Sequence, residues 1–69
     1  MSNAKYFQNI INTVRIVKAR ISDYENDLWE YMKDIDNKSR RDKLENKAKE
    51  LHTSAIELMR ETAKSYLFM

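Results

Sequence analysis

Apolar and aromatic side chains recur every seven residues through the first half of this 69-residue chain. The Phe7 series consists of Phe7, Val14, Ile21, Leu28 and Ile35. The Ile10 series lies three residues further on and consists of Ile10, Val17, Tyr24 and Tyr31. An a/d heptad pattern kept over four heptads is typical of a helix that lays one apolar stripe against another helix. The sequence therefore predicts a first helix over about residues 3–36, with both series in its seam.

A second helical pattern follows a polar run at residues 36–39, where Asp, Asn and Ser favour a turn. Ser39, with Asp42 three residues later, resembles a capping box and predicts a second helix over about residues 40–67. The stripe of this helix is Leu44, Ala48, Leu51, Ala55, Leu58 and Thr62. Folding at the polar run would lay the acidic residues 23–36 along the basic residues 38–49.

The expected fold is an all-α antiparallel two-helix hairpin, coiled-coil-like, forming a single domain over residues 1–69. The chain has no Gly and no Pro, so one continuous helix that exchanges the same contacts between chains is the rival interpretation.

The composition excludes several kinds of chemistry. Without Cys there is no disulfide, no thiolate metal site and no cysteine nucleophile. Without Gly there is no P-loop or dinucleotide-binding fingerprint. His52 is the single histidine, and a two-helix hairpin offers no shaped pocket for acid–base or nucleophilic work. We therefore expect no enzyme activity, no catalytic residue, no cofactor, no metal site and no small-molecule substrate.

A second apolar stripe lies beside the first on the second helix, and further apolar residues flank the seam of the first helix. The candidate interface residues are His52, Ile56, Met59, Ala63, Tyr66, Trp29, Met32 and Ile11. Such a stripe either widens the hairpin's own core or binds another chain. We favour the second interpretation, with a homodimeric four-helix bundle as the expected assembly and a further protein partner of unknown identity.

Basic residues suggest an alternative function, because a basic helix face can bind phosphates. The candidates are Arg15, Lys18 and Arg20 on the first helix and Arg40, Arg41, Lys43, Lys47 and Lys49 on the second. The net charge is only +2, and the second cluster also complements the acidic residues 23–36. Nucleic acid is therefore the less favoured partner.

In layout alone, a short dimerising helical hairpin resembles Rop-type plasmid regulators, which bind RNA, and the small hairpin chaperones of secretion systems, which hold a protein. No motif carries either resemblance, so it implies no site residue. The expected function is a protein–protein interaction module: an accessory, regulatory or inhibitor protein that binds a partner through a helical face. A Rop-like RNA- or DNA-binding regulator is the alternative. The abundance of Asn, Lys, Ile and Tyr suggests a phage or mobile element as the source. With no signal-peptide pattern and no membrane span, the expected location is the cytoplasm.

Overall fold

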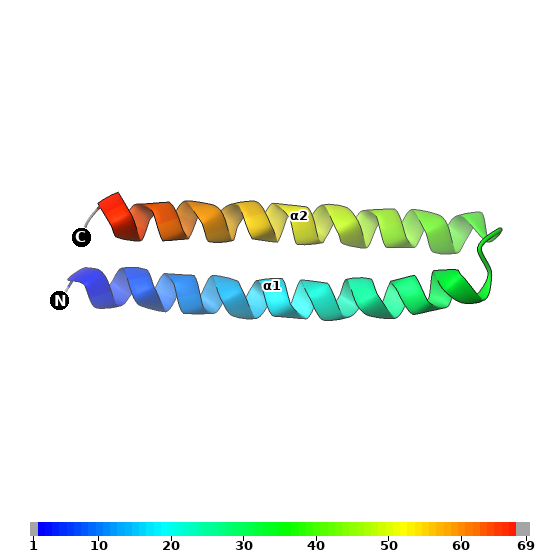
Figure 1. Ribbon diagram of the computed structural model, residues 1–69, viewed down its shortest axis with the longest axis horizontal. Helices are drawn as coiled ribbons and strands as arrows, with labels where there is room; N and C mark the ends of the chain where they lie inside the picture. The colour runs from blue at the N-terminus through cyan, green and yellow to red at the C-terminus, as the bar shows by residue number, and fades with distance from the viewer. Residues whose placement is uncertain (1, 68–69) are drawn as a thin grey trace.

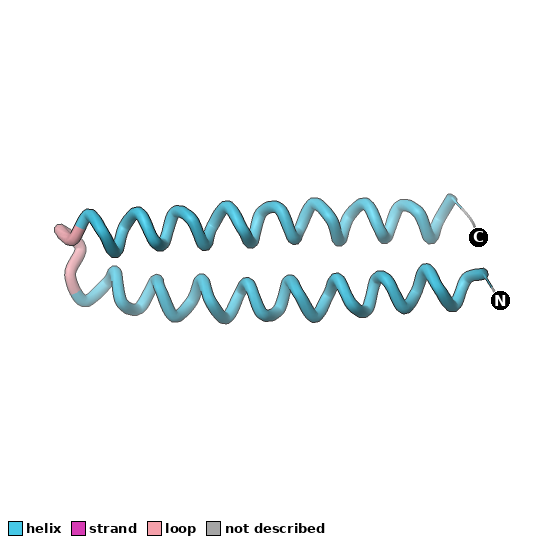
Figure 2. Tube along the Cα trace, turned by 180° about the vertical axis from the view of Figure 1, so that it is seen from behind, coloured by secondary structure: helices cyan, strands magenta, loops and turns pink. Residues whose placement is uncertain are grey.

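Two long helices run antiparallel, side by side, in the computed structural model, which describes residues 2–67 (Figure 1). Helix α1 spans Ser2–Lys33 and helix α2 spans Lys38–Leu67. One short loop joins them, and both chain termini lie at the opposite end (Figure 2). The molecule is a rod of 52 × 14 × 11 Å, two helices wide and one helix thick. The predicted all-α two-helix hairpin is confirmed, and the two helices pack along their length.

The turn lies earlier in the chain than the sequence predicts. Helix α1 ends at Lys33 and α2 begins at Lys38, whereas we expected the turn at about residues 36–39. Asn37, not Ser39, caps α2: the backbone N–H of Arg40 donates to Asn37 Oδ1 at 3.1 Å. The N–H of Arg41 donates to the Asn37 carbonyl at 3.1 Å. An Asn side chain in this position satisfies one of the backbone donors that a helix start leaves free.

The end of α1 is stabilised by a side chain from α2. The Arg40 guanidinium donates from Nη1 to the Glu30 carbonyl oxygen at 3.0 Å. The last carbonyls of a helix carry partial negative charge and lack partners within the helix. Arg40 thus joins the two helices at the turn through a backbone carbonyl. The sequence had instead suggested that it pairs with the acidic side chains of residues 23–36.

We expect Asn37→Ala to lower the free energy of unfolding by about 1 kcal/mol, because it removes the cap of α2. Thermal unfolding followed by circular dichroism at one fixed protein concentration measures this loss. Ser39→Ala is the matched control and should change the stability much less. A larger loss for Ser39→Ala than for Asn37→Ala would contradict the structure of this turn.

The face of α1 that contacts α2 is turned relative to the predicted seam. The Ile10 series is half-buried as expected, whereas three members of the Phe7 series are exposed. These three are Phe7, Ile21 and Ile35. In their place, Thr13 and Asp27 are buried and Arg20 is half-buried, a polar set that we call the Thr13 series. The prediction that both apolar series face α2 is therefore wrong for Phe7, Ile21 and Ile35, whereas Val14 and Leu28 of the same series are half-buried.

The face of α2 that contacts α1 also carries both apolar and polar side chains. Leu44, Leu51 and Leu58 are half-buried along its inner face, as predicted. Glu61 and Ser65 are the buried residues of this helix, whereas Ala48 is exposed and leaves the predicted stripe. Among the side chains whose burial the structure describes (residues 4–5 and 7–66), no hydrophobic one is buried, so much of the apolar surface of the isolated hairpin is accessible to water.

Neither described helix contains an apolar stretch long enough to cross a membrane.

Candidate functional site

Among the described residues nine large apolar side chains are exposed, and seven of them lie on one flank of the hairpin. We call this flank the apolar face and define it by four exposed residues of α1, one of the turn that follows it and two of α2. They are Phe7, Ile11, Ile21, Met32, Ile35, Met59 and Tyr66. On α1 they follow helical spacing, so they form one stripe beside the contact with α2.

Helix geometry places the two parts of this face on the same side of the molecule. In an antiparallel pair, side chains displaced from the contact in the same rotational sense about their own helices lie on the same flank. Ile21 precedes the half-buried Tyr24 by three residues, and Met59 follows the half-buried Leu58 by one. At about 100° per residue both displacements have the same sense. Ala48, Ala55 and Thr62 lie between them on α2, so small side chains border the α1 stripe.

The opposite flank is polar and carries the ion pairs that join the helices. Arg20 Nη1 lies 3.4 Å from Glu50 Oε2, and Lys43 Nζ lies 3.6 Å from Asp27 Oδ1. Lys47 also approaches Glu50, at 3.7 Å. Pairs in which both side chains are exposed each contribute about 0–1 kcal/mol, whereas the Asp27 side chain is only 10% exposed. Their position matters more than their strength. They join α1 to α2 on the polar flank, and the apolar face on the other flank stays exposed.

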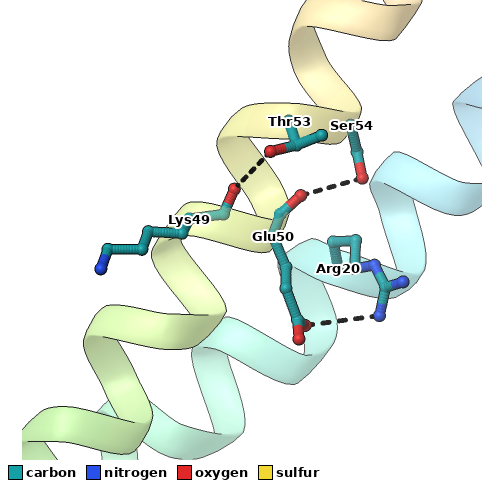
Figure 3. Close-up of a pocket in the computed structure, with 5 residues that line it drawn as sticks. All are labelled: Arg20, Lys49, Glu50, Thr53 and Ser54. Atoms are coloured by element: carbon teal, nitrogen blue, oxygen red, sulfur yellow. Dashed lines mark hydrogen bonds and ion pairs between the residues drawn. The ribbon is translucent and has the colours of Figure 1, made fainter.

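A shallow depression on this polar flank is lined by Arg20, Lys49, Glu50, Thr53 and Ser54 (Figure 3). Its hydroxyl groups are already used within α2. Thr53 Oγ1 donates to the Lys49 carbonyl and Ser54 Oγ donates to the Glu50 carbonyl, both at 3.0 Å. The Glu50 carboxylate faces the Arg20 guanidinium of α1 (Figure 3). The depression is therefore part of the contact between the helices.

Two carboxylates are buried in the hairpin, one on each helix. Asp27 and Glu61 are both buried, and each has one carboxylate oxygen without a hydrogen-bond partner among the described residues. The other oxygen of Glu61 lies 3.2 Å from Lys64 Nζ on its own helix. A buried charge with incomplete pairing weakens the fold. Such groups are kept in some proteins because they specify one arrangement of helices, and here that arrangement leaves the apolar face free.

The predicted interface residues lie outside the contact between α1 and α2, with one exception. Seven of them are exposed: Ile11, Trp29, Met32, His52, Met59, Ala63 and Tyr66. Ile56 is half-buried. Tyr66 is 75% exposed, the highest value among the large apolar side chains of residues 7–66. Trp29 lies further round α1 than the apolar face, and Ile16 is exposed on the polar flank. That these residues bind another chain stays a prediction.

The structure divides the predicted basic residues into two groups. Four of them form an ion pair with an acidic side chain or a hydrogen bond with a backbone carbonyl of the hairpin. These four are Arg20, Arg40, Lys43 and Lys47. The other four, Arg15, Lys18, Arg41 and Lys49, are exposed on different parts of the rod. The structure thus brings half of the predicted phosphate-binding set into contacts with acidic groups or backbone, and the nucleic-acid alternative stays a prediction.

Among residues 2–67, no three His, Cys, Asp or Glu side chains come together in a way that could hold a metal ion. Glu30 has a lowered pKa because the Lys33 ammonium donates a hydrogen bond to its carboxylate at 3.1 Å. Both side chains are exposed, so this pair stabilises the end of α1 and encloses no substrate.

The hairpin exposes more surface than a compact chain of the same mass, as its rod shape requires. The chain exposes 5470 Å², whereas a compact monomer of 8.3 kDa is expected to expose about 4,600 Å². The excess of roughly 900 Å² is close to the ~800 Å² that each partner contributes to a standard protein–protein interface.

The fold and the site together define a two-helix hairpin with one polar, ion-paired flank and one exposed apolar face. The chain matches no protein-family model, and neither the curated proteins nor the solved structures include a match to it. Its function must therefore be argued from the apolar face itself.

Proposed function

We propose that this chain is a small non-enzymatic protein-interaction module that binds another protein through its apolar face. The division of the hairpin into two flanks carries the proposal. Ion pairs close one flank, while seven large apolar side chains are exposed on the other. Removing apolar surface from water is the main driving force of protein association. Contiguous exposed patches of this kind are typical of interaction sites.

The proposed first partner is a second copy of the chain, which gives a homodimeric four-helix bundle. A two-helix chain of this length buries too little apolar area to be more than marginally stable alone. A second hairpin laid on the apolar face would enclose the exposed members of the Phe7 series among four helices. The roughly 900 Å² of excess surface is enough for such a contact.

Met59→Asp tests the position of the binding surface. Met59 is exposed on α2 within the apolar face, so the substitution leaves the contact between α1 and α2 intact. We expect it to weaken self-association about 10- to 100-fold, since a carboxylate would have to be desolvated at the interface. Light scattering over a dilution series measures the mass, and circular dichroism on the same samples reports helix content. Unchanged self-association of Met59→Asp would contradict the proposal that this face binds protein.

A further inference from the structure

The α1 part of the apolar face has a charge pattern that fits its own reversed copy. Lys18 and Glu25 interrupt the apolar stripe, one on each side of Ile21. Both side chains are exposed, and neither forms an ion pair with another described residue. Their neighbours in the stripe are apolar in both directions along the helix. These two charges are thus the polar elements that a partner of this stripe must match.

Reversing the stripe about Ile21 places opposite charges beside each other and apolar side chains beside apolar side chains. Lys18 then faces Glu25 of the second copy, and Glu25 faces its Lys18. Among the apolar positions, Ile11 faces Met32, Val14 faces Leu28, and Phe7 faces Ile35. Ile21 faces itself. A parallel arrangement in register would instead oppose Lys18 to Lys18 and Glu25 to Glu25, and like charges at an interface disfavour it.

Side-chain size on the two helices also favours contact through α1. The middle of the α1 stripe carries the large Val14, Ile21 and Leu28, whereas α2 carries Ala48 and Ala55 on the same flank. Large side chains on one helix beside small ones on its neighbour make α1 the more prominent helix of the face. In a dimer formed through this face, the α1 helices of the two copies would therefore make the closest contact, with α2 beside it.

From these observations we propose that the partner is a second copy bound antiparallel through α1, with the two-fold axis beside Ile21 and two symmetric Lys18–Glu25 ion pairs. This inference rests on the proposed function and adds to it the partner, its direction and its register. An isologous two-fold contact of this kind is the commonest form of homodimer.

Charge reversal at the two positions tests the direction and the register. In the antiparallel dimer, Lys18→Glu places two carboxylates together on each side of the two-fold axis, and Glu25→Lys places two ammonium groups together there. We expect each single variant to weaken the dimer roughly tenfold at low salt, with a smaller effect at high salt. The double variant Lys18→Glu/Glu25→Lys should restore the wild-type affinity. An equimolar mixture of the two single variants should form a heterodimer of wild-type affinity.

The outcomes separate this inference from the proposed function. In a parallel dimer each single variant exchanges one like-charge pair for another, so its affinity would stay near that of the wild type. If the single variants leave the dimer unchanged while Met59→Asp weakens it, the face is correct and the antiparallel register is wrong. A wild-type chain that stays monomeric at high concentration would overturn the choice of a second copy as the partner.

A distance measurement checks the direction without relying on charge. The chain has no Cys, so Asp36→Cys places one spin label at the turn of each hairpin. With the axis beside Ile21, the two labels should lie about 45 Å apart at a rise of ~1.5 Å per residue. Labels within about 20 Å would place both turns at the same end of the bundle and contradict the antiparallel arrangement.

Discussion

Ile21→Asp is expected to convert the chain from a dimer to a monomer at micromolar concentration. Ile21 lies where the proposed two-fold axis crosses α1, so the substitution places two carboxylates opposite each other in an otherwise apolar contact. Burial of unpaired charge is strongly unfavourable, and like charges add to the penalty. We expect the dimer to weaken about 100-fold or more, which corresponds to about 3 kcal/mol. Sedimentation over a dilution series measures the change.

Ile16→Asp is the matched control for this experiment. Both residues are isoleucines of α1 with similar exposure, 48% for Ile21 and 51% for Ile16. They differ in position, since Ile16 lies on the polar flank, one helical turn before Arg20. The control should dimerise like the wild type. Equal dissociation by the two variants would show that the effect comes from damage to α1 itself, and would contradict the assignment of the apolar face.

Glu61→Leu is expected to raise the free energy of unfolding by about 1–2 kcal/mol, because replacing a buried, incompletely paired charge with an apolar side chain is often stabilising. The Glu61 side chain is only 11% exposed and its ion pair with Lys64 lies within α2. The substitution therefore removes no contact between the helices that an ion pair provides. Urea unfolding at fixed protein concentration measures the gain.

Glu57→Leu separates the effect of burial from the effect of charge. Glu57 forms the same kind of pair, with Arg60 three residues later, but its side chain is 49% exposed. We expect Glu57→Leu to change the free energy of unfolding of the protein by less than about 0.5 kcal/mol. A loss of stability in Glu61→Leu, with Glu57→Leu neutral, would show that the buried carboxylate has a stabilising partner and would contradict its role as an unfavourable group.

Heptad spacing was sufficient to predict two helices and their antiparallel pairing, since apolar periodicity reports directly on helical faces. It did not predict which face of α1 closes the hairpin. Thr13 and Asp27 are buried where the spacing pointed to Phe7 and Ile21. Periodicity counts apolar residues, whereas the contact is also set by ion pairs such as Lys43–Asp27. The turn was misplaced for a related reason, because several residues of the polar run can cap a helix.

The buried polar residues left a signal in the sequence that hydrophobicity alone does not reveal. Thr13, Arg20 and Asp27 recur every seven residues on α1, as Lys47, Ser54 and Glu61 do on α2. Two polar series with heptad spacing indicate a polar side to the helix contact. If the α2 series is placed against α1, helix geometry turns Met59 and Tyr66 away from the contact, and both are exposed. The identity of a bound protein is a property of two surfaces, and one chain's sequence contains only one of them.

We propose that the apolar face of this hairpin is covered by protein, first of all by a second copy of the chain. Light scattering of the wild-type chain over a dilution series tests it most directly, with circular dichroism on the same samples. We expect a helical species of twice 8.3 kDa that loses helix content as it dissociates, because in the proposed dimer each hairpin depends on the other for its apolar burial. A fully helical monomer with the same melting temperature at every concentration would contradict it.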